Sequence, residues 1–323
     1  MKRFLILSLS LWVLLFAVPL IAVRGQDVPA SAVKRNVSSG IDAATEITLL
    51  ETDGKIIKLP LNKYLEGVLA DEMPALFPEE ALRAGAVVAR TNAMKKAAAA
   101  ASAHKGAMLC SNPAHCAAYK PLSSVAVSWG VSRDAYSEKI RRAVSDTDGE
   151  ILLYNKAPIS ATFFDMSSGR TENASDVWGK PIPYLVSVDS TCDTKAEGFS
   201  HKISIPSAEF KAKFIAKHPK AKFSPDPATW ISNITRSDAG GVLRLTVGGV
   251  PTVGSQLRTQ FALRSTNFRV ACTADTVTFE TQGSGHGVGL SQCGARAMAD
   301  DGRGYRDILT HYFTGVTFGK IQK

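Results

Sequence analysis

One carboxyl group stands out because its place on a predicted helix is one that an apolar residue would normally take. Between residues 61 and 69 apolar side chains recur at helical spacing, and the next position on that face is Glu72, whereas Glu66 and Asp71 fall off it. Pro74 ends the helix just beyond. Apolar surroundings raise the pKa of a carboxyl, as a general acid near neutral pH requires. The alternative is a capping or ion-paired glutamate at a helix end.

A second group of residues has the donor atoms of a metal site. Two imidazoles and two thiolates form a complete tetrahedral zinc set, which leaves no open position and therefore predicts a structural rather than a catalytic metal. The alternative is a disulfide between the two cysteines, which an oxidising compartment favours; spacing alone does not separate the two. The four residues are His104, Cys110, His115 and Cys116.

Two loops could contact a ligand. In residues 283–292 glycines frame His286, so the backbone can approach a ligand there, and the histidine has either a binding or catalytic role or a structural one. Cys293 follows, and a Cys293/His286 nucleophile pair would make the protein a peptidase. The loop at 167–180 carries hydroxyls and flexible backbone suited to a polyhydroxylated ligand, or is an ordinary turn. Its candidate residues are Ser167, Ser168, Gly169 and Thr171.

The elements that must position these groups form an α+β pattern. Residues 46–50 and 55–61 predict a hairpin around Asp53-Gly54 that leads into the Glu72 helix, and a second helix begins at Pro78. Strands are predicted at 149–155, 158–165, 183–190, 241–250 and 276–280, and helices at 207–223, 254–263 and 304–313. Strands and helices are intermixed without regular βαβ alternation, so we expect a mixed sheet and helix domain of the α+β class.

The N-terminus predicts a membrane anchor. After Lys2 and Arg3, residues 4–23 carry no charge, which is enough to span a bilayer, and the following residues make a poor signal-peptide cleavage site. We therefore expect an uncleaved, single-pass anchor at 1–24, a linker at 25–45, and an ectodomain at 46–323 on the extracytoplasmic side of the cell membrane.

The charge balance favours an acidic partner. Lys and Arg number 38 against 29 acidic residues, a formal charge of +9. A polyanion is therefore an expected partner, and the predicted topology favours an acidic polymer outside the membrane and argues against nucleic acid.

Four motifs, in order along residues 46–318, resemble the stage II sporulation protein D family, whose domain also occurs in the LytB amidase enhancers. They are YLEGVLADEMPALFPEEALRAGAVVART, SSGRTENASDVWGKPIPYLVSVDS, LRSTNF and GHGVGLSQCGARAMA. The resemblance implies a lytic transglycosylase that cuts peptidoglycan glycan strands stripped of stem peptides during sporulation engulfment. It also implies a membrane complex with an amidase, an endopeptidase and a membrane scaffold.

The resemblance also assigns residues. Glu72 matches the catalytic glutamate, and some family members hold zinc through two His and two Cys in the segment of His104, Cys110, His115 and Cys116, which favours metal over disulfide. Arg90, His286 and Gln292 match motif positions. Two residues depart from the pattern: Gly85 replaces a usual glutamine, and Cys293 replaces a usual aromatic residue.

The expected chemistry needs a single carboxyl. In a lytic transglycosylase the muramic C6 hydroxyl replaces water, so Glu72 serves as acid and then as base, whereas hydrolases of the usual kind need two acids. Stripped strands expose lactyl carboxylates, which Arg90, Lys180 or the lysines between 211 and 222 could bind. The alternative is a non-enzymatic amidase enhancer that binds the wall.

Overall fold

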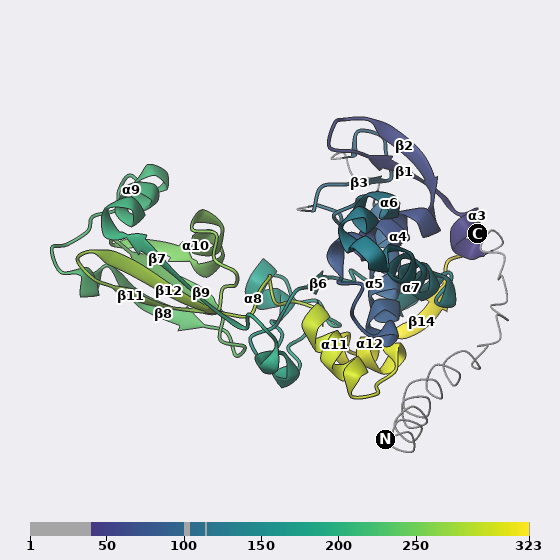
Figure 1. The fold of residues 1–323 in the computed structure, drawn as a ribbon. Helices are drawn as coiled ribbons and strands as arrows, with labels where there is room; N and C mark the ends of the chain where they lie inside the picture. Colours follow the sequence, from purple (N-terminus) through teal and green to yellow (C-terminus); the bar gives the residue numbers. More distant parts are fainter. Residues whose placement is uncertain (1–39, 100–103, 114, 323) are drawn as a thin grey trace, which may run out of the picture. The chain divides into compact units, whose positions relative to one another are not determined.

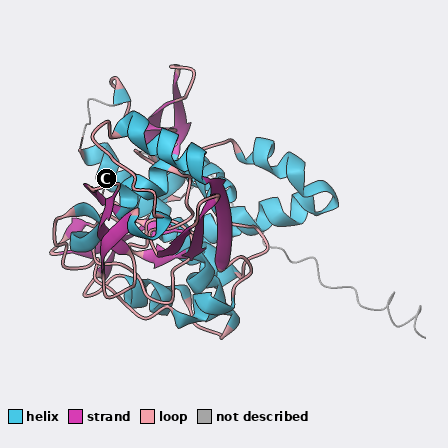
Figure 2. Cartoon of the chain, turned by 90° about the vertical axis from the view of Figure 1, so that its left-hand side faces the viewer, coloured by secondary structure: helices cyan, strands magenta, loops and turns pink. Residues whose placement is uncertain are grey.

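The computed structural model describes residues 40–99, 104–113 and 115–322, which lie within one compact unit spanning 38–323. Helices and strands follow one another in irregular order along the chain, and Figure 2 shows them intermixed, so the α+β class is confirmed. None of the helices in this described part is long and apolar enough to cross a membrane. The predicted anchor at 1–24 lies outside the described residues.

One group of elements builds a first hydrophobic core around two helices, α4 and α5. The helices of this group are α3 (Ile41–Ala44), α4 (Leu61–Glu72), α5 (Glu79–Ala98), α6 (Leu122–Val125), η3 (Ala126–Ser132), α7 (Arg133–Asp146), α11 (Gln292–Asp300) and α12 (Tyr305–Tyr312). Its strands are β1 (Glu46–Leu50), β2 (Ile56–Pro60), β3 (Leu109–Cys110), β4 (Glu150–Tyr154), β5 (Ala157–Pro158), β6 (Phe163–Phe164), β13 (Leu290–Ser291) and β14 (Thr317–Lys320). The chain thus returns to this core at its C-terminal end, where yellow elements lie among purple and blue ones (Figure 1).

Small sheets hold the first core in place. β1 pairs antiparallel with β2, with Glu46 opposite Pro60, and parallel with β3. β4 lies between β14 and β5, and the two-residue β6 pairs parallel with β13. Every residue of the predicted apolar stripe in α4 is buried: Leu61, Tyr64, Leu65, Val68 and Leu69. Alanines on α5 let it pack closely against neighbouring helices, and this face is also buried.

A second core is built mainly from aromatic side chains. Its elements are β7 (Ser200–Pro206), α9 (Ser207–Lys217), η5 (Pro227–Thr229), β8 (Ile231–Arg236), β9 (Val242–Val247), β10 (Val250–Val253), α10 (Gly254–Gln260), β11 (Phe268–Cys272) and β12 (Thr276–Gln282). The strands form two sheets, in the orders β10-β9-β8 and β11-β12-β7. Phe210 of α9 stacks on Phe261, which in turn stacks on Phe279 of β12. Two short helices, α8 (Ala174–Trp178) and η4 (Thr191–Lys195), lie along the chain between the two groups.

The predicted strand at 158–165 is not continuous, since only Pro158 (in β5) and Phe163–Phe164 (β6) belong to strands.

Three further expectations need correction. Residues 183–190 form no strand, although Leu185 is buried. Only some of their backbone groups pair with the backbone of residues 169–174, and the side chains of Thr171 and Asn173 take the place of other partners. Glu66, expected off the apolar face, is 3% exposed and its carboxylate is held by Lys63 at 3.0 Å. The C-terminal part of the predicted linker is folded, because α3 buries Asp42.

Candidate functional site

Glu72 is the last residue of α4, and its side chain is half-buried as the apolar stripe predicts. The backbone N–H of Ala118 donates to its Oε1 at 3.0 Å. Burial raises the pKa of Glu72 above its ordinary value, the Ala118 hydrogen bond opposes this, and the negative charge of Asp71 adds to the rise. The carboxyl therefore holds a proton at higher pH than an exposed glutamate does, as a general acid must.

Gln292 fixes the backbone at the same point. Its Nε2 donates to the carbonyl oxygen of Glu72 at 3.1 Å. Gln292 is the first residue of α11, whose N-cap Ser291 accepts from the N–H of Gly294 and donates to buried Asp193 at 2.8 Å. The two motifs that carry Glu72 and Gln292 therefore meet in space, as their shared site role predicts.

A cleft of about 700 Å³ opens in front of Glu72. Gln292 also lines it, together with charged and aromatic residues that were not predicted as site residues. Trp129 is one, held edge-on by Tyr136 at a centroid separation of 5.8 Å. The others that matter here are Phe77, Asp165, Glu197, Arg264 and Arg296. Phe77, Arg264 and Arg296 lie within the family motifs, which was a signal for them. Trp129, Asp165 and Glu197 come from segments outside those motifs, and no local spacing relates them to Glu72.

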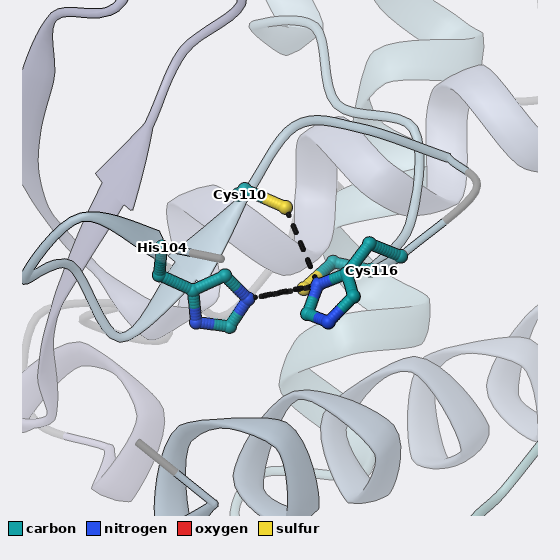
Figure 3. A group of neighbouring side chains, drawn as sticks. His104, Cys110 and Cys116 are labelled. Atoms are coloured by element: carbon teal, nitrogen blue, oxygen red, sulfur yellow. Dashed lines mark hydrogen bonds between the residues drawn. The ribbon is translucent and has the colours of Figure 1, made fainter. Parts of the chain in front are cut away.

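The four predicted metal ligands converge. All their donor atoms lie within 4.8 Å of one another, and Figure 3 shows three of the side chains pointing toward a common centre. His104 Nε2 lies 3.0 Å from His115 Nδ1, and each histidine lies 3.3 to 3.6 Å from the Cys116 sulfur. Donor atoms around a tetrahedral zinc ion would be about 3.3 to 3.8 Å apart, a range that lies within the 3.0 to 4.8 Å found here. Both cysteines are free thiols, so the alternative disulfide is absent from this described cluster.

This cluster and Glu72 share a segment of chain. Cys116 lies two residues before Ala118, whose N–H binds the Glu72 carboxylate, and Tyr119 then stacks on Tyr64 of α4 at 5.6 Å. Burial lowers the pKa of His104, which favours the neutral imidazole that binds metals. The residues present can hold a metal ion, and that ion would fix the loop that orients Glu72.

Comparison with known proteins agrees with these features. Residues 51–154, which contain Glu72 and the four-residue cluster, match the family model described as stage II sporulation protein. The chain is 37% identical to stage II sporulation protein D of Bacillus subtilis (strain 168) over 261 residues, which are 80% of this chain and 74% of that protein. The chain belongs to the stage II sporulation protein D family. The chain is also 36% identical to stage II sporulation protein D of Bacillus amyloliquefaciens, again over 80% of this chain and 74% of that protein.

A more distant relative is the amidase enhancer of Bacillus subtilis, 25% identical over 78% of this chain and 40% of that protein. Membership of the sporulation protein D family indicates a role in sporulation. This membership is also consistent with an enzyme that degrades the cell wall. Neither relative's name states a reaction.

The two departures from the family pattern both line the site. Gly85 faces Met73, and a Cβ at position 85 would overlap the Met73 sulfur, so Met73 fills the space that a longer side chain would need. Cys293 lies in the cleft with its sulfur 3.8 Å from Asp165. Burial and this carboxylate raise the pKa of Cys293 to about 12, so the thiol stays protonated and is a poor nucleophile. The peptidase alternative therefore loses its nucleophile.

Arg90, expected to contact substrate, lies in the interior instead. It is fully buried, and its guanidinium binds Asp42 at 2.6 to 2.9 Å and the carbonyl oxygens of Val144 and Glu150. Thr147 accepts its remaining donor. All five N–H donors are thus used within the protein, and the family motif residue has a structural role here.

The hydroxyl loop and His286 lie around a separate hollow of about 20 Å³ that Glu72 does not line. Ser167 and Thr171 are buried and donate to backbone carbonyls, Ser168 donates to Ala239, and Gly169 is needed for its φ of +106°. Burial and the nearby Arg258 lower the pKa of His286 to about 4, so the imidazole is neutral. In this conformation these hydroxyls serve the fold, and the structure does not bring this group together with Glu72.

Proposed function

We propose that this protein is a peptidoglycan lytic transglycosylase that cleaves glycan strands stripped of stem peptides during sporulation engulfment. The observation that supports this best is Glu72, a half-buried carboxyl with a raised pKa at the edge of a cleft of about 700 Å³. A cleft of this size can hold part of a glycan strand next to the carboxyl. Family membership supplies the setting, which is sporulation.

The reaction follows from the hydrogen bonding of Glu72. Ala118 donates to Oε1, so the proton of the neutral acid belongs on Oε2, which passes it to the glycosidic oxygen as the bond to the anomeric carbon breaks. The resulting carboxylate takes the proton of the muramic C6 hydroxyl as that oxygen attacks the anomeric carbon. The products are a free hydroxyl and a 1,6-anhydro end, and Glu72 is protonated again.

The test is product analysis with the full chain. Glu72→Gln keeps the acceptor for Ala118 but cannot donate the proton, so release of anhydro products from stripped strands should fall about 10²- to 10⁴-fold while thermal unfolding stays cooperative. Full activity of this variant would refute the assignment.

Asp165 makes hydrolysis the second candidate, because it places another carboxyl in the same cleft. A hydrolase would use both acids and leave reducing ends, which are heavier than anhydro ends by one water molecule. Mass spectrometry of the products separates the two reactions. Asp165→Asn should leave anhydro formation within a few-fold of the parent chain if one carboxyl suffices.

The amidase enhancer relative supports a non-enzymatic alternative, in which the chain binds the wall and stimulates an amidase. Such a protein would raise amidase turnover and form no new ends by itself. Assaying purified chain on stripped strands and on intact peptidoglycan, with and without an amidase, separates this role from catalysis.

We further propose that the four-residue cluster binds a structural zinc ion and that residues 1–24 anchor the chain in the cell membrane. Four protein ligands would complete the tetrahedron and leave zinc no position for substrate, so His104, Cys110, His115 and Cys116 would hold the loop of Ala118. The ectodomain would work outside the membrane in a complex with an amidase, an endopeptidase and a membrane scaffold.

A further inference from the structure

Arg264 is the best-anchored cation in the cleft of Glu72. It lies between α10 and β11, its side chain is 32% exposed, and its Nη1 donates to the carbonyl oxygen of Gly198 at 3.0 Å. Gly198 has a φ of +74°, and a Cβ there would lie 3.1 Å from Nη1, so glycine allows the guanidinium to approach. The loop at Gly198 is therefore shaped to hold this side chain.

The internal partner of Arg264 is weakly bound. Asp165 lies 3.5 Å from Nη2, which is long for a charge-assisted hydrogen bond, and its side chain is 49% exposed. A guanidinium has five N–H donors, and Gly198 and Asp165 take two of them. A planar guanidinium that is fixed in position and still has unused N–H donors can bind a second carboxylate.

The lining of the cleft has no excess of positive charge. Its described ionisable residues include four acids and two arginines: Asp71, Glu72, Asp165, Glu197, Arg264 and Arg296. The chain's net charge of +9 is therefore not concentrated at this site, and a polyanionic strand needs a localised cation there. Arg296 is less suitable because its side chain is 59% exposed, against 32% for Arg264.

We propose that Arg264 binds the lactyl carboxylate of a muramic acid residue next to the bond that Glu72 cleaves, and that this carboxylate displaces Asp165. The inference rests on the proposed function, since it takes the cleft to hold a glycan strand. Stem peptides convert the lactyl carboxylate to a neutral amide, so Arg264 provides selectivity for stripped strands.

Binding measurements test this apart from catalysis. The full chain carrying Glu72→Gln is titrated with stripped glycan strands and with the same strands after the lactyl groups are converted to methylamides. Arg264→Gln should weaken binding of the carboxylate strands about tenfold or more and leave methylamide binding unchanged. Equal weakening for both ligands, or none for the carboxylate strands, overturns the proposal.

Further variants separate carboxylate binding from a structural ion pair. Asp165→Asn frees Arg264, so affinity for the carboxylate strands should stay the same or rise; a loss as large as that of Arg264→Gln would mean that the pair only supports the fold. Arg264→Lys keeps the charge and should retain part of the discrimination even if Arg264→Gln folds poorly. Arg296→Gln is the matched control and should have the smaller effect. Because none of these readouts requires cleavage, failure of Glu72 as catalyst leaves them interpretable.

Discussion

Glu72 and Arg90 are both ionisable residues of family motifs, yet the structure treats them in opposite ways. Arg90 is fully buried, and protein groups accept from every one of its N–H donors. Glu72 is half-buried and faces a cleft, and its carboxylate accepts one hydrogen bond, from the backbone N–H of Ala118. The first arrangement stabilises the fold and leaves nothing for a ligand. The second leaves a carboxyl with unused hydrogen-bonding capacity where a ligand can reach it. The unused hydrogen-bonding capacity of a side chain therefore indicates which residue does chemistry better than its membership of a motif does.

The largest effect should come from breaking the Arg90 pair. Arg90→Gln leaves Asp42 buried without its cation, which we expect to lower the free energy of unfolding by about 3 to 5 kcal/mol in urea titrations. Replacing both residues, Arg90→Met with Asp42→Leu, should recover part of that loss and restore cleavage. A double variant that is stable but does not bind strands would show that Arg90 contacts substrate after all.

Metal removal should have the next largest effect, because the cluster supports the loop that carries Ala118. Cys110→Ser should reduce bound zinc well below one ion per chain, as measured by elemental analysis, and lower cleavage about 10- to 100-fold. Cys272→Ser, in the second core, is the control and should keep the metal. Unchanged zinc in Cys110→Ser would exclude these ligands.

Much of the Glu72 side of this comparison could be predicted from sequence, because it depends on local rules. The apolar stripe of α4 and the stop at Pro74 place the acid on a buried face next to a helix end. The structural role of Arg90 could not be predicted, since its partner Asp42 lies 48 residues earlier, in a segment whose polar composition predicted a linker. The cleft wall at Trp129 likewise depends on tertiary packing that leaves no periodic signal.

A smaller effect should appear in the pH profile. The first step needs protonated Glu72, so cleavage should decline as pH rises through its raised pKa. The charge of Asp71 contributes to that rise, so Asp71→Asn should lower the pKa of Glu72, move the declining limb to lower pH and reduce activity at pH 7 a few-fold. Asp53→Asn, in the exposed β1–β2 turn, should leave the profile unchanged.

The smallest effect should be a gain in stability on removing the Glu72 charge. A carboxyl whose pKa is raised on folding contributes stability below its unfolded pKa and loses that contribution as pH rises through the folded pKa. Glu72→Gln should therefore match the parent chain near pH 4 and be more stable than it at pH 8 in urea titrations. Glu197→Gln, an exposed acid of the same cleft, should show no such pH-dependent gain. A loss of stability at pH 8 would mean that ionised Glu72, like Arg90, is there to hold the fold.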